Sequence, residues 1–166
     1  MSKQESIPEM EFFSEPRPVA GPWRVGIVMG GLEIALSGLS EDLAARLRRR
    51  FAVYLVDGQV SREALQVTVG EEDRDYFIDP PDTPEFNPIL IRCDGDRVRY
   101  MGYRVAGWFD TRGGAGTLLL ARGTYEPAER AVENYIRAAV AWQAATLGGA
   151  LVHGASAVLD GKGYLF

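Results

Sequence analysis

The segment from Glu126 to Leu147 predicts one long amphipathic helix, and no other part of the chain constrains the fold as strongly. Pro127 suits the first turn of a helix, where its missing N–H costs no hydrogen bond. Gly148-Gly149 then provides the glycine stop that commonly ends a helix. One largely apolar face is formed by Val132, Tyr135, Ile136, Ala139, Val140, Gln143 and Leu147.

Most of the chain before this helix consists of short runs typical of β-strands, separated by turn signals. Asp94-Gly95-Asp96 and the glycine-rich loop from Gly113 to Gly116 predict hairpins, so we expect antiparallel β-structure in the middle of the chain. The predicted strands are Trp23 to Met29, Leu32 to Leu36, Ala52 to Val56, Ala64 to Val69, Ile89 to Cys93, Arg97 to Met101, Arg104 to Asp110 and Thr117 to Ala121.

A second, shorter helix is expected from Glu41 to about Arg50. Ser40 offers an N-cap, and the acidic residues that follow it favour the positive end of the helix dipole. The arginines between Arg46 and Arg50 lie near the other end, where positive charge offsets the dipole. We interpret them as a solvated helix face and not as a nucleic-acid patch, because a clear aromatic stacking platform is missing.

The predicted fold class is α+β: an antiparallel β-rich N-terminal region, then the long helix, then two strands. Those last strands are Leu151 to Leu159 and Lys162 to Phe166, joined by the turn Asp160-Gly161. Three parts follow from this pattern. Residues 1–21 form a flexible, proline-containing leader, 22–125 a β-rich domain with one helix, and 126–166 the helix and strand pair. Within the second part, Gly70 to Pro88 is expected to be a long acidic surface loop.

Composition narrows the classes of function. The formal charge of −5 gives no overall attraction to nucleic acid or anionic lipid, so neither is an expected partner. The single cysteine, Cys93, excludes an internal disulfide framework, and its apolar surroundings predict a small buried side chain. The first residues do not resemble a signal peptide, and no run approaches the ~18 apolar residues of a membrane span. The predicted location is the cytoplasm.

Several motifs that resemble ligand sites have simpler explanations. A strand follows the loop Gly113-Gly114-Ala115-Gly116, whereas a phosphate cradle needs a following helix N-terminus, so we expect a hairpin loop. The carboxylates Asp94 and Asp96, and those of Glu71, Glu72, Asp73 and Asp75, lack the spacing of a calcium loop. We interpret both groups as solvated turns and predict no metal site.

Nucleophilic catalysis would have to use His153, the only histidine of the chain. Ser156 lies three residues further along a predicted strand, so the two side chains should point to opposite faces, which argues against a dyad. Gly161-Lys162 is not a Walker A motif either. The first glycine of that motif would fall on Ser156, and its serine or threonine on Gly163. Lys162 is therefore expected beside a hairpin turn.

The run from Gly148 to Phe166, GGALVHGASAVLDGKGYLF, resembles the lead-in to the P-loop of HPr kinase/phosphorylase-like proteins. In that family a strand bearing His-Gly or His-Ala precedes a small turn, an apolar strand and then a loop of the form G-x-S-G-x-G-K-[ST]. The preceding helix, from Glu133 through Trp142, is similar to the corresponding helix of the HPr-kinase-related branch. The resemblance covers about Glu126 to Phe166.

This resemblance implies a fold like that of phosphoenolpyruvate carboxykinase, with ATP and Mg²⁺ used to phosphorylate a serine or another acceptor. Of the functional residues only His153 can be carried over, to a position close to the phosphate site, and a hydrogen-bonded structural role is its equal alternative. The P-loop and the metal-binding carboxylates would follow Phe166, so the resemblance predicts the N-terminal portion of a longer kinase. No cofactor-binding residue is assigned within this chain.

Three functional hypotheses follow. The leading one is a catalytically inert N-terminal part of an HPr-kinase-like ATP-dependent kinase, which recognises a protein or small-molecule phosphoacceptor. The second is a stand-alone protein-binding or assembly module, acting as a homo-oligomer through its terminal strand edge. The third is a small metal-independent enzyme centred on His153. The residues do not identify the acceptor or the oligomeric state.

Overall fold

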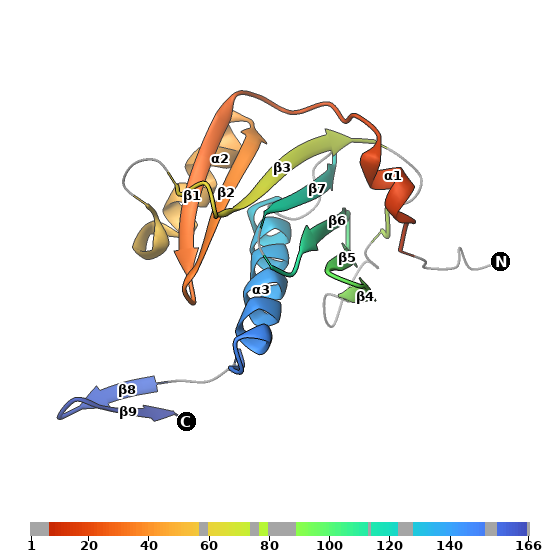
Figure 1. The fold of residues 1–166 in the computed structure, drawn as a ribbon. Helices are drawn as coiled ribbons and strands as arrows, with labels where there is room; N and C mark the ends of the chain where they lie inside the picture. The colour runs from red at the N-terminus through yellow and green to blue at the C-terminus, as the bar shows by residue number, and fades with distance from the viewer. Residues whose placement is uncertain are drawn as a thin grey trace.

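In the computed structural model, seven strands form one mixed sheet that carries helices on both faces (Figure 1). The structure describes residues 7–56, 60–73, 77–79, 89–112, 114–122, 128–151 and 156–165. The elements of the first half are α1 (Met10–Ser14), β1 (Trp23–Met29), β2 (Leu32–Leu39), α2 (Glu41–Arg50), the 3₁₀ helix η1 (Ala52–Tyr54) and β3 (Leu65–Glu72). Those of the second half are β4 (Leu90–Asp94), β5 (Arg97–Gly102), β6 (Val105–Asp110), β7 (Ala115–Ala121), α3 (Ala128–Thr146), β8 (Ser156–Leu159) and β9 (Lys162–Leu165).

The strand order is β1-β2-β3-β7-β6-β5-β4. Strands β4 to β7 form an antiparallel meander, as predicted, and β1 pairs with β2 in the same manner. The expectation of a purely antiparallel region is wrong at the centre, because β3 is parallel to both β2 and β7. The chain between β2 and β3 contains α2, and a crossover of this kind is what parallel neighbours require.

The two helices predicted from local sequence signals are present as α2 and α3. The N-cap predicted at Ser40 is confirmed, since its hydroxyl accepts a hydrogen bond of 3.2 Å from the N–H of Leu43. The predicted long helix is confirmed as α3, and Gly148 follows it with a φ of 77°, a conformation that glycine adopts without strain. The α+β class of the fold is therefore established.

Helices α2 and α3 pack on one face of the sheet, and α1 lies on the other (Figure 1). Alternation along β7 shows the two faces: Leu118 and Leu120 join the core under α2 and α3, whereas Leu119 joins the smaller cluster under α1. The main core extends across the sheet from β1 to β5 in the strand order and includes the buried face of α3.

The proline-rich start of the chain, expected as a flexible leader over 1–21, contains the short helix α1. In its described part, 7–21, Phe13 of α1 is buried against Met101, Ala106 and Leu119. Arg17 is also buried, and its guanidinium bonds a Glu72 carboxylate oxygen at 3.0 Å. The prolines predicted the lack of long regular structure, but the packing of single side chains on a distant sheet leaves no local signal.

Three further predictions differ from the structure. Ala52 to Val56 is not a strand: residues 52–54 form η1, and Leu55 makes only an isolated bridge to Ile27. The acidic loop does not begin at Gly70 as expected, because β3 continues to Glu72 in register with β7, and residues 74–76 and 80–88 of that loop lie outside the described residues. Cys93 is exposed and not buried, because it lies on β4, the last strand of the sheet.

The C-terminal hairpin is confirmed, with Asp160 and Gly161 at the turn between β8 and β9. Strand β8 begins at Ser156, so the part of the predicted strand over 152–155 lies outside the described residues. Figure 1 shows this hairpin beyond the C-terminal end of α3, away from the large sheet. Among the helices of the described ranges, none is long and apolar enough to cross a membrane.

Tyr135 fixes α3 on the sheet. Its hydroxyl donates a hydrogen bond of 2.7 Å to the carbonyl oxygen of Trp108, and its ring meets Tyr100 and Phe109 edge-on. Gly116 lies directly beneath the hydroxyl, where an added Cβ would overlap the Tyr135 oxygen. A glycine is therefore required there by the close approach of a side chain.

We expect Tyr135→Phe to lower the free energy of unfolding by about 1 kcal/mol, because it removes a buried hydrogen bond and leaves the Trp108 carbonyl without that donor. Gly116→Ala should cost more in the native background than in the Tyr135→Phe background, since the phenylalanine lacks the oxygen that the new Cβ meets. Urea unfolding followed by circular dichroism measures both effects. Tyr54→Phe at an exposed site is the control, and strictly additive effects would contradict this contact.

Candidate functional site

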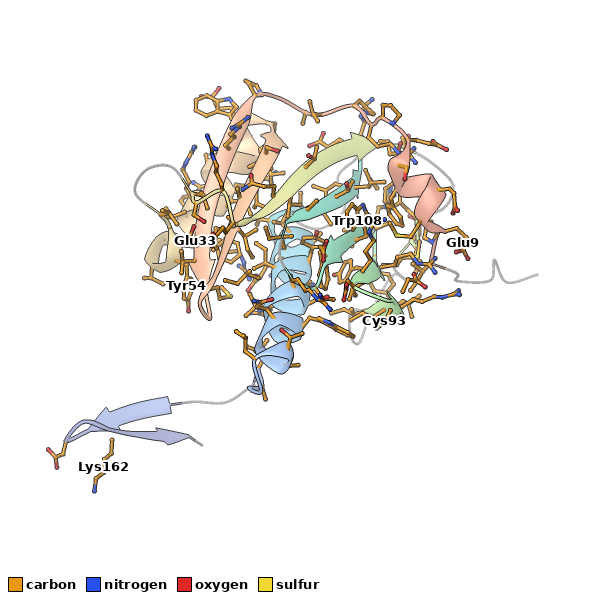
Figure 2. All side chains as sticks on the ribbon, in the orientation of Figure 1. Glu9, Glu33, Tyr54, Cys93, Trp108 and Lys162 are labelled. Carbon is orange, nitrogen blue, oxygen red and sulfur yellow. The ribbon has the colours of Figure 1, made fainter. Side chains whose placement is uncertain are left out.

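The candidate residues from the sequence do not come together. His153 lies outside the described residues, and so does Asp75. Ser156 begins β8. Lys162 begins β9 directly after the turn, as predicted, and Figure 2 shows its side chain on the hairpin, far from the sheet.

Both acidic clusters noted in the sequence, Asp94 with Asp96 and the one that contains Glu72, have members that form ion pairs with arginines. Arg99 bonds Asp94, Arg112 bonds Asp96 at 3.1 Å, and Arg17 bonds Glu72. The solvated-turn interpretation is therefore wrong for Glu72, which is buried inside β3. A search of the described ranges finds no group of three metal-ligating side chains.

The pKa shifts of Asp94, Tyr100 and Tyr135 favour structural roles for these groups. The hydrogen bond from Arg99 lowers the pKa of the Asp94 carboxyl, so this residue stays ionised at neutral pH. Burial raises the pKa of Tyr100 and of Tyr135, so both phenols stay protonated. None of these groups is poised for proton transfer near pH 7.

The arginines of α2 separate into two sets. Arg46 pairs with Glu129 at 3.5 Å, and Arg50 pairs with Glu133, so these two connect α2 to α3. Arg48 points the other way: its Nη2 donates to the Arg24 carbonyl at 2.9 Å, and its guanidinium carbon lies 5.6 Å from the Trp23 ring centre. Arg48, Arg49 and Arg50 are exposed, as expected for a solvated helix face, whereas Arg46 is half-buried beside Glu129.

A pocket of about 800 Å³ lies at β1 and β2 beside charged side chains, and we call it the arginine pocket. It falls within the usual volume range of small-ligand sites, roughly 300–1,000 Å³. Its lining residues include Arg24, Gly26, Ala35, Arg48, Leu55, Val56, Val60, Ser61, Arg62 and Gln66.

The pocket exists because the chain crosses from one face of the sheet to the other between α2 and β3. Val56 donates its N–H to the Gly26 carbonyl at 3.2 Å, at the outer edge of β1. Further along, the Ser61 N–H donates to a Glu33 carboxylate oxygen at 2.8 Å, over β2. Figure 2 shows Glu33 and Tyr54 together at this end of the sheet.

Gly26 sets the depth of the pocket. It lies on the β1 face opposite the buried Val25 and Ile27, and an added Cβ there would overlap Cγ2 of Val60. Ala35 is its register partner on β2, so two small residues form the floor. A glycine inside a strand often marks such a close approach of another segment.

Three arginines give the pocket its charge. Arg24 from β1, Arg48 from α2 and Arg62 from the crossing segment all line it, and all three are exposed. Over the described ranges, no ion pair joins any of them to a carboxylate, whereas eight other arginines each have such a partner. Those eight are Arg17, Arg46, Arg50, Arg92, Arg99, Arg104, Arg112 and Arg137.

The arginines and the apolar lining together suit a ligand that carries a carboxylate or phosphate group on an apolar part. A guanidinium presents several N–H groups in a planar fork that fits carboxylate and phosphate oxygens. Ser61 and Gln66 add neutral hydrogen-bonding groups, and Leu55, Val56 and Val60 supply apolar contact. The sequence alone does not reveal this site, because its three arginines are separated by 24 and 14 positions. The one available signal was Gly26 within a strand.

No protein-family model, curated protein or solved structure matches this chain.

We expect Gly26→Ala to lower the free energy of unfolding by about 1–3 kcal/mol, because the new methyl group forces Val60 and the crossing segment away from the sheet. Adding Val60→Ala should recover most of this loss, since it removes the methyl group that the new Cβ meets. Chemical unfolding of the single and double variants measures the coupling. Equal costs of Gly26→Ala with valine or alanine at position 60 would contradict the packing described here.

Proposed function

We propose that this chain is the acceptor-recognition part of an HPr-kinase-like ATP-dependent kinase, and that the arginine pocket binds an anionic group of the acceptor. The observation that carries the proposal is the gathering of Arg24, Arg48 and Arg62, all without carboxylate partners in the described ranges, around an apolar hollow. In a chain of net charge −5, such a local positive site favours an acidic ligand over a non-specific surface effect.

The kinase context comes from the sequence resemblance between Glu126 and Phe166. A long helix, a glycine stop and a strand pair with a tight turn are the features that the resemblance requires there, and α3, β8 and β9 have this order. We propose that they form the start of a phosphoenolpyruvate-carboxykinase-like core. In that arrangement ATP and Mg²⁺ would be held by a P-loop outside these 166 residues, and His153 would lie near the phosphates.

The proposed role of this chain is therefore recognition and not phosphoryl transfer. The acceptor, a protein or a small molecule, would present its carboxylate or phosphate group to the arginines, while its apolar part contacts Val56 and Val60. The proposed location is the cytoplasm.

Calorimetric titration of the chain with a panel of anions tests this proposal. The panel comprises a phosphate monoester with an aromatic group, an aromatic dicarboxylate and an acidic peptide. At least one should bind in the arginine pocket, and affinity should fall as salt is added, since exposed charges are screened. Arg24→Gln and Arg62→Gln should each weaken binding about tenfold or more, because each removes a charge-assisted hydrogen bond.

Arg122→Gln is the matched control, since Arg122 is exposed, lies outside the pocket and has no ion pair in the described ranges. Equal losses for Arg122→Gln and Arg62→Gln would contradict the assignment to the pocket. Turnover of Mg-ATP by this chain would contradict the inert role.

A further inference from the structure

We propose that the free edge of β4 pairs with β4 of a second copy of this chain, so that the two sheets join around a two-fold axis at Cys93. This inference is independent of the arginine pocket, which lies at the other end of the sheet beside β1. Strand β4 is the last in the strand order and pairs only with β5 in the described part of the chain. An edge of this kind is a template for another strand.

The backbone of β4 is arranged for such a partner. Asp94 and Arg97 flank a two-residue turn, with Gly95 at a φ of 61°, and residues beside a turn of this length exchange hydrogen bonds. Alternation along the strand then directs the N–H and C=O groups of Ile91 and Cys93 away from β5. These are the groups that a second strand would bind.

β4 lacks several of the features that usually prevent an edge strand from pairing with another chain. β4 contains neither lysine nor proline, and its pairing with β5 is regular without a bulge. Ile89 and Ile91 expose 45% and 43% of their surface, and a groove of about 570 Å³ runs between them and residues 7–9. Figure 2 shows Glu9 and Cys93 at this end of the molecule. Pairing would cover these isoleucines.

The charges on β4 complement those of a second copy of the same strand, and they determine which residues of the two strands lie opposite each other. Arg92 and Asp94 lie on the same face of β4, two residues apart and of opposite sign. Antiparallel pairing centred on Cys93 sets Arg92 of each copy opposite Asp94 of the other, which gives two new ion pairs. Centring on Arg92 or on Asp94 would set like charges opposite each other, which is unfavourable. Among the registers centred on Arg92, Cys93 and Asp94, only the one centred on Cys93 sets opposite charges against each other.

Sedimentation of the full chain over concentrations of about 1 to 100 µM tests the proposal, since a contact of this size should be weak and reversible. We expect the mass to rise from that of one copy toward that of two. Arg92→Glu should abolish the rise, because it sets Glu opposite Asp94. Cys93→Pro should do the same, because it removes an outward N–H while leaving the β5 side intact. Arg112→Glu, the same charge change at an exposed site off this edge, should leave the mass unchanged.

Cys93 gives a second readout, since opposite residues in an antiparallel pair have Cα atoms about 5.5 Å apart, within disulfide reach. Mild oxidation should link two native copies, and Arg92→Glu should reduce the yield several-fold. A mass of one copy at all concentrations would overturn the proposal. So would a dimer that survives both Arg92→Glu and Cys93→Pro, because another surface would then hold it, or stable capture of a different protein at β4 without self-association.

Discussion

The contact on which the structure depends most is the packing of Tyr135 against Gly107 of β6 and Gly116 of β7. The hydroxyl reaches the Trp108 carbonyl only because Gly116, and next to it Gly107, have no side chains in its path. A long amphipathic helix has many ways to lie on an apolar sheet, since hydrophobic attraction is not directional. A buried hydrogen bond combined with close packing selects one of them. The position of α3 is therefore fixed by a single tyrosine and the space that two glycines leave for it.

The position of α2 follows from that of α3. Arg46 and Arg50 reach Glu129 and Glu133, so the two helices lie side by side on one face of the sheet. The chain that leaves α2 passes the edge of β1 at Leu55 and Val56 before it reaches β3. This crossing folds Val60 and Ser61 over the opposite face, and the hollow beneath them is the arginine pocket. The candidate site is thus a consequence of how the helix layer is fixed.

The sequence was sufficient where the signal is local. The Ser40 cap, the glycine stop after α3 and the turns of the hairpins depend on a few neighbouring residues, and all appear where expected. It was insufficient where partners are distant in the chain. The parallel pairing of β3, the burial of Arg17 with Glu72 and the exposure of Cys93 at the sheet edge depend on strand order. The residues of the arginine pocket come from β1, β2, α2, β3 and the chain between α2 and β3, so no motif could reveal it.

Charge has two roles in this protein. Most arginines of the described ranges have carboxylate partners and hold elements together, whereas the three at the pocket are available to a ligand. Backbone amide shifts during titration with the aromatic phosphate monoester and dicarboxylate test this division most directly. The account predicts that Gly26, Ala35, Ser61 and Gln66 move together and saturate, while β4 stays unchanged. Changes spread over the surface in proportion to local charge, or none near Gly26, would contradict it.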